Sequence, residues 1–204
     1  MSISCQSQTQ TYTIETNLGN IRIKLYDNTP LHKANFEKLV KEQLYDSVLF
    51  HRIIQGFMIQ TGNPDTRTVK DRAGLADNDS VNYTVPAEFV PENFHKKGTI
   101  AAARTGDAVN PEKRSSSSQF YIVQGRTYQD DELDAIEERL QMKYSEFQRG
   151  IYKTLGGTPF LDQNYTVFGE VVDGLDVVDK IAAVPTGAGD WPQVDIRILK
   201  IVKD

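Results

Sequence analysis

The sequence is poor in cysteine and has no long apolar run, and each absence narrows what the chain can be. Its 204 residues include one cysteine, Cys5, so no disulfide can form within the chain and the core must hold by packing. No apolar stretch reaches the roughly 18 residues that a transmembrane helix needs. The formal net charge is −5, so nothing favours nucleic acid or an anionic membrane as a partner.

Metal-binding and nucleophilic motifs are missing as well. The three histidines, His32, His51 and His95, share no metal-ligand spacing. The serine run Ser115–Ser118 has neither a base nor an elbow motif beside it, so we interpret it as a loop that enters a strand. The sequence therefore predicts no metal ion and no other cofactor.

The composition that remains is that of a globular protein. Hydrophobic residues make up 39% of the chain and charged residues 25%, a balance typical of one compact domain with a sizeable core. We expect residues 1–11 to form a flexible N-terminal segment and residues 12–204 to form a single domain, and we expect a monomer.

The first residues leave the cellular location open. Met1–Cys5 is too short to be a secretory signal, so the chain as given predicts a cytoplasmic protein. The residues Ser-Ile-Ser-Cys followed by a polar run are, however, typical of the end of a bacterial lipoprotein signal. If a signal lies upstream, Cys5 is the lipidated residue, Gln6–Thr11 is a tether, and the protein belongs to the cell envelope.

Residue patterns predict many short strands and two covering helices. A threonine followed by proline begins one helix, over Pro30–Gln43, and apolar spacing predicts a second over Leu175–Val184. Many antiparallel strands favour a closed barrel, which leaves no sheet edge exposed. The predicted strands are Tyr12–Thr16, Ile21–Leu25, Val48–Ile54, Phe57–Gln60, Thr99–Ala103, Gln119–Val123, Tyr165–Val172 and a closing strand over Val194–Val202.

Residues 50–62, Phe-His-Arg-Ile-Ile-Gln-Gly-Phe-Met-Ile-Gln-Thr-Gly, carry the strongest functional signal. They bring the guanidinium of Arg52 close to Phe57, Met58 and Gln60 on two predicted strands. An arginine beside aromatic and thioether carbons indicates an apolar pocket with one fixed hydrogen-bond donor. The alternative for an isolated arginine is an exposed residue on an ordinary β-hairpin.

Three further blocks follow in order: Ile100–Gly106, Ser115–Ile122 and Phe160–Gly169. With residues 50–62 they resemble the cyclophilin family of peptidyl-prolyl cis-trans isomerases, over about Tyr12–Val202. The resemblance implies a closed eight-stranded antiparallel β-barrel capped by two helices. It also implies an enzyme that accelerates rotation about Xaa-Pro bonds in unfolded or flexible polypeptides, without a cofactor.

The resemblance further implies roles for individual residues. Arg52 would stabilise the twisted amide, Gln60 would brace the arginine, and Phe57 would complete the catalytic set. Phe57 would also line the apolar proline pocket with three of the substrate-binding residues. The implied substrate-binding residues are Met58, Ala103, Arg104, Gln119, Tyr121, Phe160, Leu161 and Tyr165.

Four of these positions depart from the pattern best known in eukaryotic cyclophilins and resemble the bacterial branch. Arg104 stands for asparagine, Tyr121 for phenylalanine, Phe160 for tryptophan and Tyr165 for histidine. Isomerase activity is still expected, but phenylalanine lacks an indole N–H, so we expect weak cyclosporin binding. The alternative function is a proline-peptide-binding chaperone or scaffold module with little turnover, which would have little use for Arg52.

An insertion of about residues 126–158 separates the last two blocks. Within it Leu133, Ile136, Leu140, Tyr144, Phe147 and Ile151 recur at steps of three or four. We predict one amphipathic helix over Asp131–Gly150, whose apolar stripe either packs on the barrel or serves as a docking or substrate-selecting element. No implied site residue lies inside it, so its deletion is expected to leave turnover of a short peptide largely unchanged.

Overall fold

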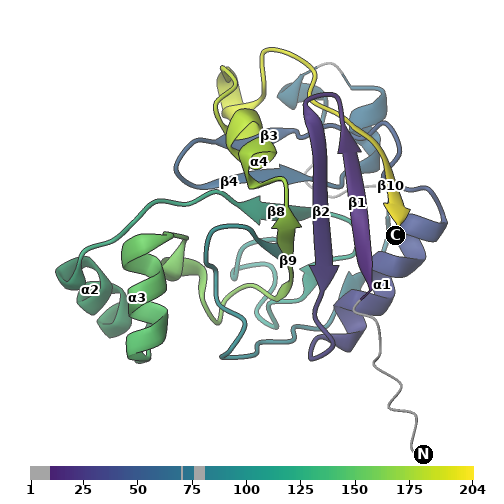
Figure 1. The fold of residues 1–204 in the computed structure, drawn as a ribbon. Coiled ribbons are helices and arrows are strands. Elements are labelled where there is room, and N and C mark those ends of the chain that lie inside the picture. Colours follow the sequence, from purple (N-terminus) through teal and green to yellow (C-terminus); the bar gives the residue numbers. More distant parts are fainter. Residues whose placement is uncertain (1–9, 70, 76–80) are drawn as a thin grey trace, which may run out of the picture.

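The computed structural model describes residues 10–69, 71–75 and 81–204, so Cys5 and most of the predicted N-terminal segment lie outside the described residues. Eight strands form one antiparallel sheet in the order β10-β1-β2-β9-β6-β8-β4-β3 (Figure 1). A second sheet pairs β5 (Thr84–Val85) with β7 (Ser115–Ser116). The eight strands are β1 (Thr11–Thr16), β2 (Gly19–Leu25), β3 (Arg52–Ile54), β4 (Met58–Thr61), β6 (Thr99–Ala102), β8 (Phe120–Val123), β9 (Val167–Asp173) and β10 (Ile198–Lys203).

The two edge strands, β3 and β10, are joined through the residues that precede them. The Phe50 amide donates to the Ile196 carbonyl and the Ile198 amide donates to the Val48 carbonyl, both at 2.8 Å. These bonds curl the sheet back on itself and pair backbone groups that an open edge would expose. The prediction of an eight-stranded antiparallel, barrel-like sheet is confirmed, although only the end of the strand predicted over Val48–Ile54 pairs with β4.

Alternate residues of the strands fill the inside of the sheet. Ile14, Ile21 and Ile23 are fully buried there, and each such side chain contributes about 1.5–3 kcal/mol relative to exposure. The ring of Phe36 closes one end of this core, with ring centroids 5.3 to 5.9 Å from those of three further aromatic residues, Tyr45, Phe120 and Phe168.

Both predicted covering helices are present, α1 (Pro30–Lys41) and α4 (Leu175–Ala182), at different ends of the curled sheet (Figure 1). The start of α1 is capped by the distant Glu88, whose carboxylate accepts from the amides of Leu31 and His32 at 3.0 and 2.9 Å. This negative charge satisfies free N–H groups at the positive end of the helix dipole. Among the described residues, no helix has the length and apolar character to cross a membrane.

The segment between β8 and β9 forms two helices, so the prediction of one helix over Asp131–Gly150 was wrong. These helices are α2 (Asp130–Leu140) and α3 (Glu146–Thr154). Gln141 ends α2 in the left-handed conformation, with φ 53°, and Ser145 starts α3 with a capping box. The apolar spacing continues across this turn because both helices face one cluster, so spacing alone could not reveal the break.

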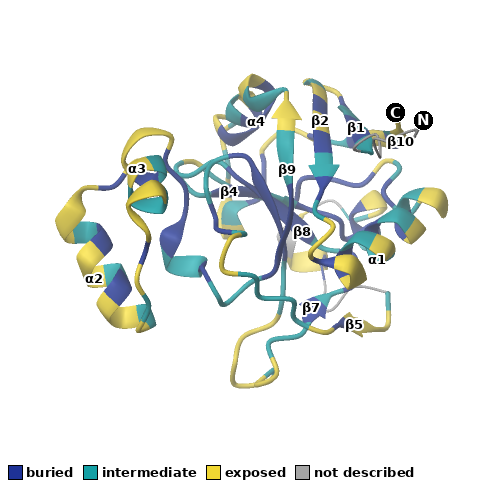
Figure 2. Cartoon of the chain, turned by 60° about the horizontal axis from the view of Figure 1, so that its bottom comes forward, coloured by how far each residue is buried: buried dark blue, intermediate teal, exposed yellow. Residues whose placement is uncertain are grey.

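The insert, residues 126–158, packs around a small core of its own. Its apolar residues bury against Phe94, which belongs to the main body of the fold. Figure 2 shows that the outer surfaces of both helices are largely exposed. This arrangement favours the packing alternative for the apolar stripe. The buried members of this core are Phe94, Tyr128, Leu133, Tyr144 and Tyr152.

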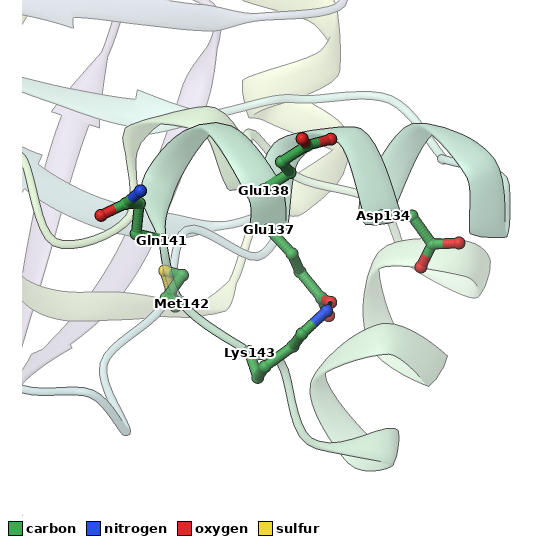
Figure 3. A pocket seen from close by; sticks show the side chains of 6 residues that line it. All are labelled: Asp134, Glu137, Glu138, Gln141, Met142 and Lys143. Atoms are coloured by element: carbon green, nitrogen blue, oxygen red, sulfur yellow. Dashed lines mark hydrogen bonds and ion pairs between the residues drawn. The ribbon is translucent and has the colours of Figure 1, made fainter.

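An open hollow on the insert lies at the turn between α2 and α3 (Figure 3). The buried Glu137 carboxylate there accepts from Lys143 Nζ at 2.7 Å, Arg149 Nη1 at 3.0 Å and the Tyr144 amide at 3.1 Å. Burial raises the pKa of Glu137, but these three donors outweigh it and hold the pKa below its usual value. The carboxylate therefore anchors the turn. The hollow is lined by Asp134, Glu137, Glu138, Gln141, Met142 and Lys143.

Candidate active site

The implied site residues of β3 and β4 lie on the outer face of the sheet. Arg52 is directly opposite Gln60, and Ile54 is directly opposite Met58. Residues opposite one another in an antiparallel pair share a face, whereas the intervening Ile53 points into the core. The strand pairing therefore brings all four side chains to one side, a relation that the sequence alone left open.

An apolar set of side chains, here called the outer-face cluster, covers the same side of the sheet. It draws residues from β4, β6, β8, β9 and the 3-10 helix η3 (Pro159–Leu161). Four implied members of the proline pocket, Phe57, Met58, Tyr121 and Leu161, lie together in it. Its buried residues are Met58, Ala101, Tyr121, Val123 and Val167, and its partly buried residues are Tyr26, Ile54, Phe57, Ala103, Leu161 and Tyr165.

Arg52 is held by a carboxylate that the sequence analysis missed. Its Nε lies 3.2 Å from Oδ2 of Asp190, and both side chains are 42% exposed. Asp190 belongs to the 3-10 helix η4 (Ala188–Asp190), 138 residues further along the chain. The terminal guanidinium nitrogens of Arg52 make no hydrogen bond to any described residue, so the outer edge of the fork is open to a ligand.

The two implied glutamines bind each other. Gln60 Nε2 donates to Gln119 Oε1 at 3.2 Å. The resemblance implies that Gln60 braces Arg52, which stays a prediction; the structure adds the carboxylate of Asp190 as a partner of Arg52. The glutamine pair lies beside Arg52, because Gln60 is directly opposite Arg52 and Gln119 directly precedes β8.

Ala103 and Arg104 follow β6 and differ in how their main chains are used. The Ala103 amide donates to the Gln119 carbonyl at 2.9 Å, and its carbonyl accepts from the Ser116 amide at 2.8 Å. The main chain of Arg104 makes no hydrogen bond with any residue that the structure describes. Of the two residues, Arg104 is therefore the one whose backbone is open to pair with an extended peptide.

The Arg104 side chain is committed to the protein itself. Its Nε donates to the Asn164 carbonyl at 2.7 Å, and its Nη1 donates to Asp107 Oδ1 at 2.6 Å. A hydrogen bond from Arg104 holds the pKa of the Asp107 carboxyl below its usual value. The guanidinium also lies 4.6 Å from the ring centroid of Tyr165. Arg104 thus packs against Tyr165 at the margin of the outer-face cluster.

Phe160 stands beside the outer-face cluster. Its ring centroid lies 5.6 Å from that of Phe57, with the two planes tilted by 35°. The two rings extend the apolar surface of the cluster beyond Met58 and Tyr121.

Behind the cluster runs a buried chain of polar groups. The Tyr121 hydroxyl lies 3.0 Å from His95 Nε2, and His95 Nδ1 lies 2.6 Å from Asp162 Oδ1. Asp162 Oδ2 accepts from the Tyr152 hydroxyl. The four residues are at most 4% exposed, and burial raises the pKa of both tyrosines well above the usual value. Asp162 lies within the block Phe160–Gly169, but the resemblance implied no role for it, for His95 or for Tyr152.

Within the described residues, no group of three or more His, Cys, Asp or Glu side chains is arranged to hold a metal ion. The chemistry on offer is one open guanidinium, two amide side chains and free backbone groups beside an apolar surface. Such a site can bind and polarise a peptide.

Comparison with known proteins identifies the family. The model of the cyclophilin type peptidyl-prolyl cis-trans isomerase/CLD family matches residues 11–203. A peptidyl-prolyl cis-trans isomerase of Acinetobacter baylyi is 36% identical, over 92% of this chain and 82% of that protein. A Streptococcus pyogenes protein, described as a bifunctional phosphatase/peptidyl-prolyl cis-trans isomerase, is also 36% identical over 91% of this chain, which spans 37% of its length.

Solved structures agree in fold. A crystal structure of a Cryptosporidium parvum cyclophilin type peptidyl-prolyl cis-trans isomerase matches with a TM-score of 0.69 and 24% identity, over 96% of this chain and 97% of that chain. A second structure of that protein, determined in the presence of the dipeptide Ala-Pro, matches with a TM-score of 0.68. The family model and the A. baylyi relative both cover nearly the whole of this chain, which therefore belongs to the cyclophilin-type peptidyl-prolyl cis-trans isomerase family.

Proposed function

We propose that this protein accelerates cis–trans rotation of Xaa-Pro bonds in unfolded or flexible polypeptides, with Arg52 stabilising the twisted amide. Family membership supports the reaction class. Rotation about a peptide bond faces a barrier of about 18–20 kcal/mol, and an Xaa-Pro bond exchanges over tens of seconds without catalysis. A catalyst must bind the twisted amide more tightly than either planar form.

The observation that carries the proposal is the open edge of the Arg52 guanidinium, on the same face as the outer-face cluster. As the amide twists, its nitrogen regains a lone pair and becomes a hydrogen-bond acceptor. A fixed cationic donor aimed at that nitrogen stabilises the transition state more than the ground state. Arginine suits this role because it stays charged and its donors form a rigid fork.

The neighbouring groups can hold the substrate in place. The proline ring packs on Phe57, Met58, Tyr121 and Leu161, and the preceding residues pair with the open main chain of Arg104. The structure of the C. parvum relative in the presence of Ala-Pro is consistent with such a ligand. Gln60 and Gln119 offer additional amide groups for the peptide backbone.

The energy required is within reach of this arrangement. Shortening exchange from tens of seconds to milliseconds takes about four powers of ten, or roughly 5–6 kcal/mol. Loss of one transition-state donor typically costs about 2.7–4 kcal/mol. Positioning of the proline and the backbone must therefore supply the remainder.

The test is the isomerisation rate of a short Xaa-Pro peptide with Arg52→Ala, for which we expect kcat/KM to fall at least a hundredfold while the fold is kept. Arg22→Ala is a matched control, because Arg22 is also a partly exposed, ion-paired arginine, bound to Asp204, and belongs to none of the site elements. A folded Arg52→Ala protein with near-normal turnover would refute the mechanism. Peptide binding without turnover by the wild type would favour the chaperone or scaffold alternative.

A further inference from the structure

We propose that the insert positions the proline-binding surface, through the buried chain Tyr121–His95–Asp162–Tyr152. Tyr152 of α3 is then a positioning residue for a reaction that takes place on the barrel. The inference deepens the proposed function, because it assumes that the proline ring packs on Tyr121 in the outer-face cluster.

The donor and acceptor roles along this buried chain of hydrogen bonds can be assigned. Asp162 Oδ1 accepts from the main-chain amide of His95 at 2.8 Å and lies 2.6 Å from His95 Nδ1. A carboxylate can only accept, so Nδ1 of the imidazole carries the proton and, in the neutral ring, Nε2 becomes an acceptor. In that neutral tautomer Nε2 accepts a hydrogen bond from the Tyr121 hydroxyl, which burial keeps protonated.

The hydrogen bond to His95 and two neighbouring rings hold the Tyr121 ring in place. Its plane is inclined by only 15° to the imidazole of His95, with centroids 6.1 Å apart. On another side the ring of Tyr165 meets it edge-on, at 78° and 5.9 Å. A phenylalanine here would leave Nε2 of His95 buried without its donor, which is unfavourable.

The other end of the chain lies in the insert. The Tyr152 hydroxyl donates to Asp162 Oδ2, and its fully buried ring meets those of Phe94 and Tyr144 at 5.4 and 5.3 Å. Asp162 directly follows Leu161, a member of the outer-face cluster. The Asp162 carboxylate therefore links Tyr152 of α3 to Tyr121 through His95, and the backbone of Asp162 is joined directly to Leu161 of the outer-face cluster.

A double-mutant cycle on Tyr152→Phe and Tyr121→Phe tests the proposal. Each change removes one hydroxyl from one end of the chain, and we expect each to lower kcat/KM on a short Xaa-Pro peptide about three- to tenfold. The double variant should be no slower than the slower single variant, because the chain is already broken. The matched control is Tyr128→Phe, which removes a hydroxyl from the same buried core outside the chain and should leave turnover unchanged.

A spectroscopic readout separates positioning from a loss of stability. The methyl resonance of Met58, which shares the outer-face cluster with Tyr121, should shift in Tyr152→Phe and stay in place in Tyr128→Phe. Multiplying effects in the double variant, or an unmoved Met58 signal with unchanged turnover in Tyr152→Phe, would overturn the proposal. Arg52→Ala keeps the two proposals distinct, because its loss of activity does not depend on the chain.

Discussion

The ion pair between Arg52 and Asp190 shows how far one residue's role depends on a distant partner. Because both side chains are 42% exposed, the pair contributes little to stability, about 0–1 kcal/mol. Its effect is geometric: it occupies Nε and leaves the terminal nitrogens facing outward. The left-handed backbone of Asp190, with φ 60°, aims the carboxylate at the guanidinium.

Phe160 allows a prediction about an inhibitor at the same scale. Its ring packs beside Phe57 but has no N–H donor, so a cyclosporin carbonyl that needs an indole stays unpaired, at a cost of about 1–3 kcal/mol. We expect Phe160→Trp to tighten cyclosporin binding roughly ten- to a hundredfold, measured by titration calorimetry. Turnover of a short Xaa-Pro peptide should change far less.

Peptide turnover by Phe160→Trp is the control for its cyclosporin binding, because both are measured on the same variant. Equal cyclosporin affinity in the wild type and in Phe160→Trp would mean that the missing donor does not limit binding. A parallel collapse of peptide turnover would mean that the new indole distorts the cluster.

Site residues that occur in contiguous motifs could be identified from the sequence. Partners that are far apart in the sequence and meet only in the folded protein could not. Arg52 and Met58 stand six residues apart, and strand pairing alone places them on one face. Asp190 contacts Arg52 from 138 residues away, and Asp162 contacts His95 from 67 residues away. No local pattern encodes such contacts. The expectation that Gln60 braces Arg52 came from the resemblance and stays a prediction, whereas the contact with Asp190 appeared only in the structure.

At the scale of elements, the turn between α2 and α3 depends on one buried carboxylate. Glu137 binds Lys143, Arg149 and the Tyr144 amide, so it joins the end of the first helix to the start of the second. Sequence periodicity predicted one helix because these polar contacts leave the apolar spacing intact. The break is set by the backbone of Gln141 and by a cap, which periodicity does not report.

We predict that Glu137→Gln lowers the free energy of unfolding by about 1 kcal/mol near pH 7. Hydrogen bonds to charged groups contribute about 1.5–3 kcal/mol, and the 84% exposure of the Lys143 side chain reduces the gain through solvent screening. Denaturant unfolding measures the difference. Glu138→Gln is the matched control, because Glu138 is the exposed neighbour on the same helix, and it should change stability little.

The pH dependence of this difference has a definite sign. The pKa of Glu137 in the folded protein lies below its usual value, so its contribution is fully present above the unfolded pKa of about 4.3 and is lost as the pH falls toward the folded pKa. The gap between wild type and Glu137→Gln should therefore narrow from pH 6 to pH 3. A constant gap would show that the carboxylate acts through shape alone.

At the scale of the whole molecule, the predicted strands and covering helices are present, because alternation and apolar spacing report burial directly. The main difference concerns Val48–Ile54, which pattern alone presented as one strand. Because the sheet curls, the first half of the segment pairs with Ile196–Ile198, around the start of β10, and the second half pairs with β4. The residue pattern of the segment does not contain this information, since it depends on the tertiary structure.

Deletion of residues 127–156, with a two-residue Asn-Gly turn joining Arg126 to Gly157, tests the insert as a unit. The sequence-based expectation, made for deletion of Asp131–Gly150, is largely unchanged turnover of a short peptide. The buried chain instead predicts a loss at least as large as that of Tyr152→Phe. The unfolding temperature should fall as well, because Phe94 loses its cover. Circular dichroism checks the fold, and unchanged turnover in a folded deletion variant would favour the sequence-based view.

The two ends of the insert meet at the barrel: the Gly157 amide donates to the Arg126 carbonyl at 2.9 Å, and the Arg126 amide donates back at 3.3 Å. Because the two ends are joined by backbone groups, this junction itself requires almost no particular side chains in the segment between them. Segments of other lengths and shapes can therefore be joined at the same point. Two residues are exempt from that freedom: a Cβ on Gly157 would lie 2.1 Å from the His95 carbonyl oxygen, and a Cβ on Gly156 would lie 2.5 Å from the Arg126 carbonyl oxygen. A replacement segment can therefore differ in length from the present one, provided that glycines stay where the two ends meet.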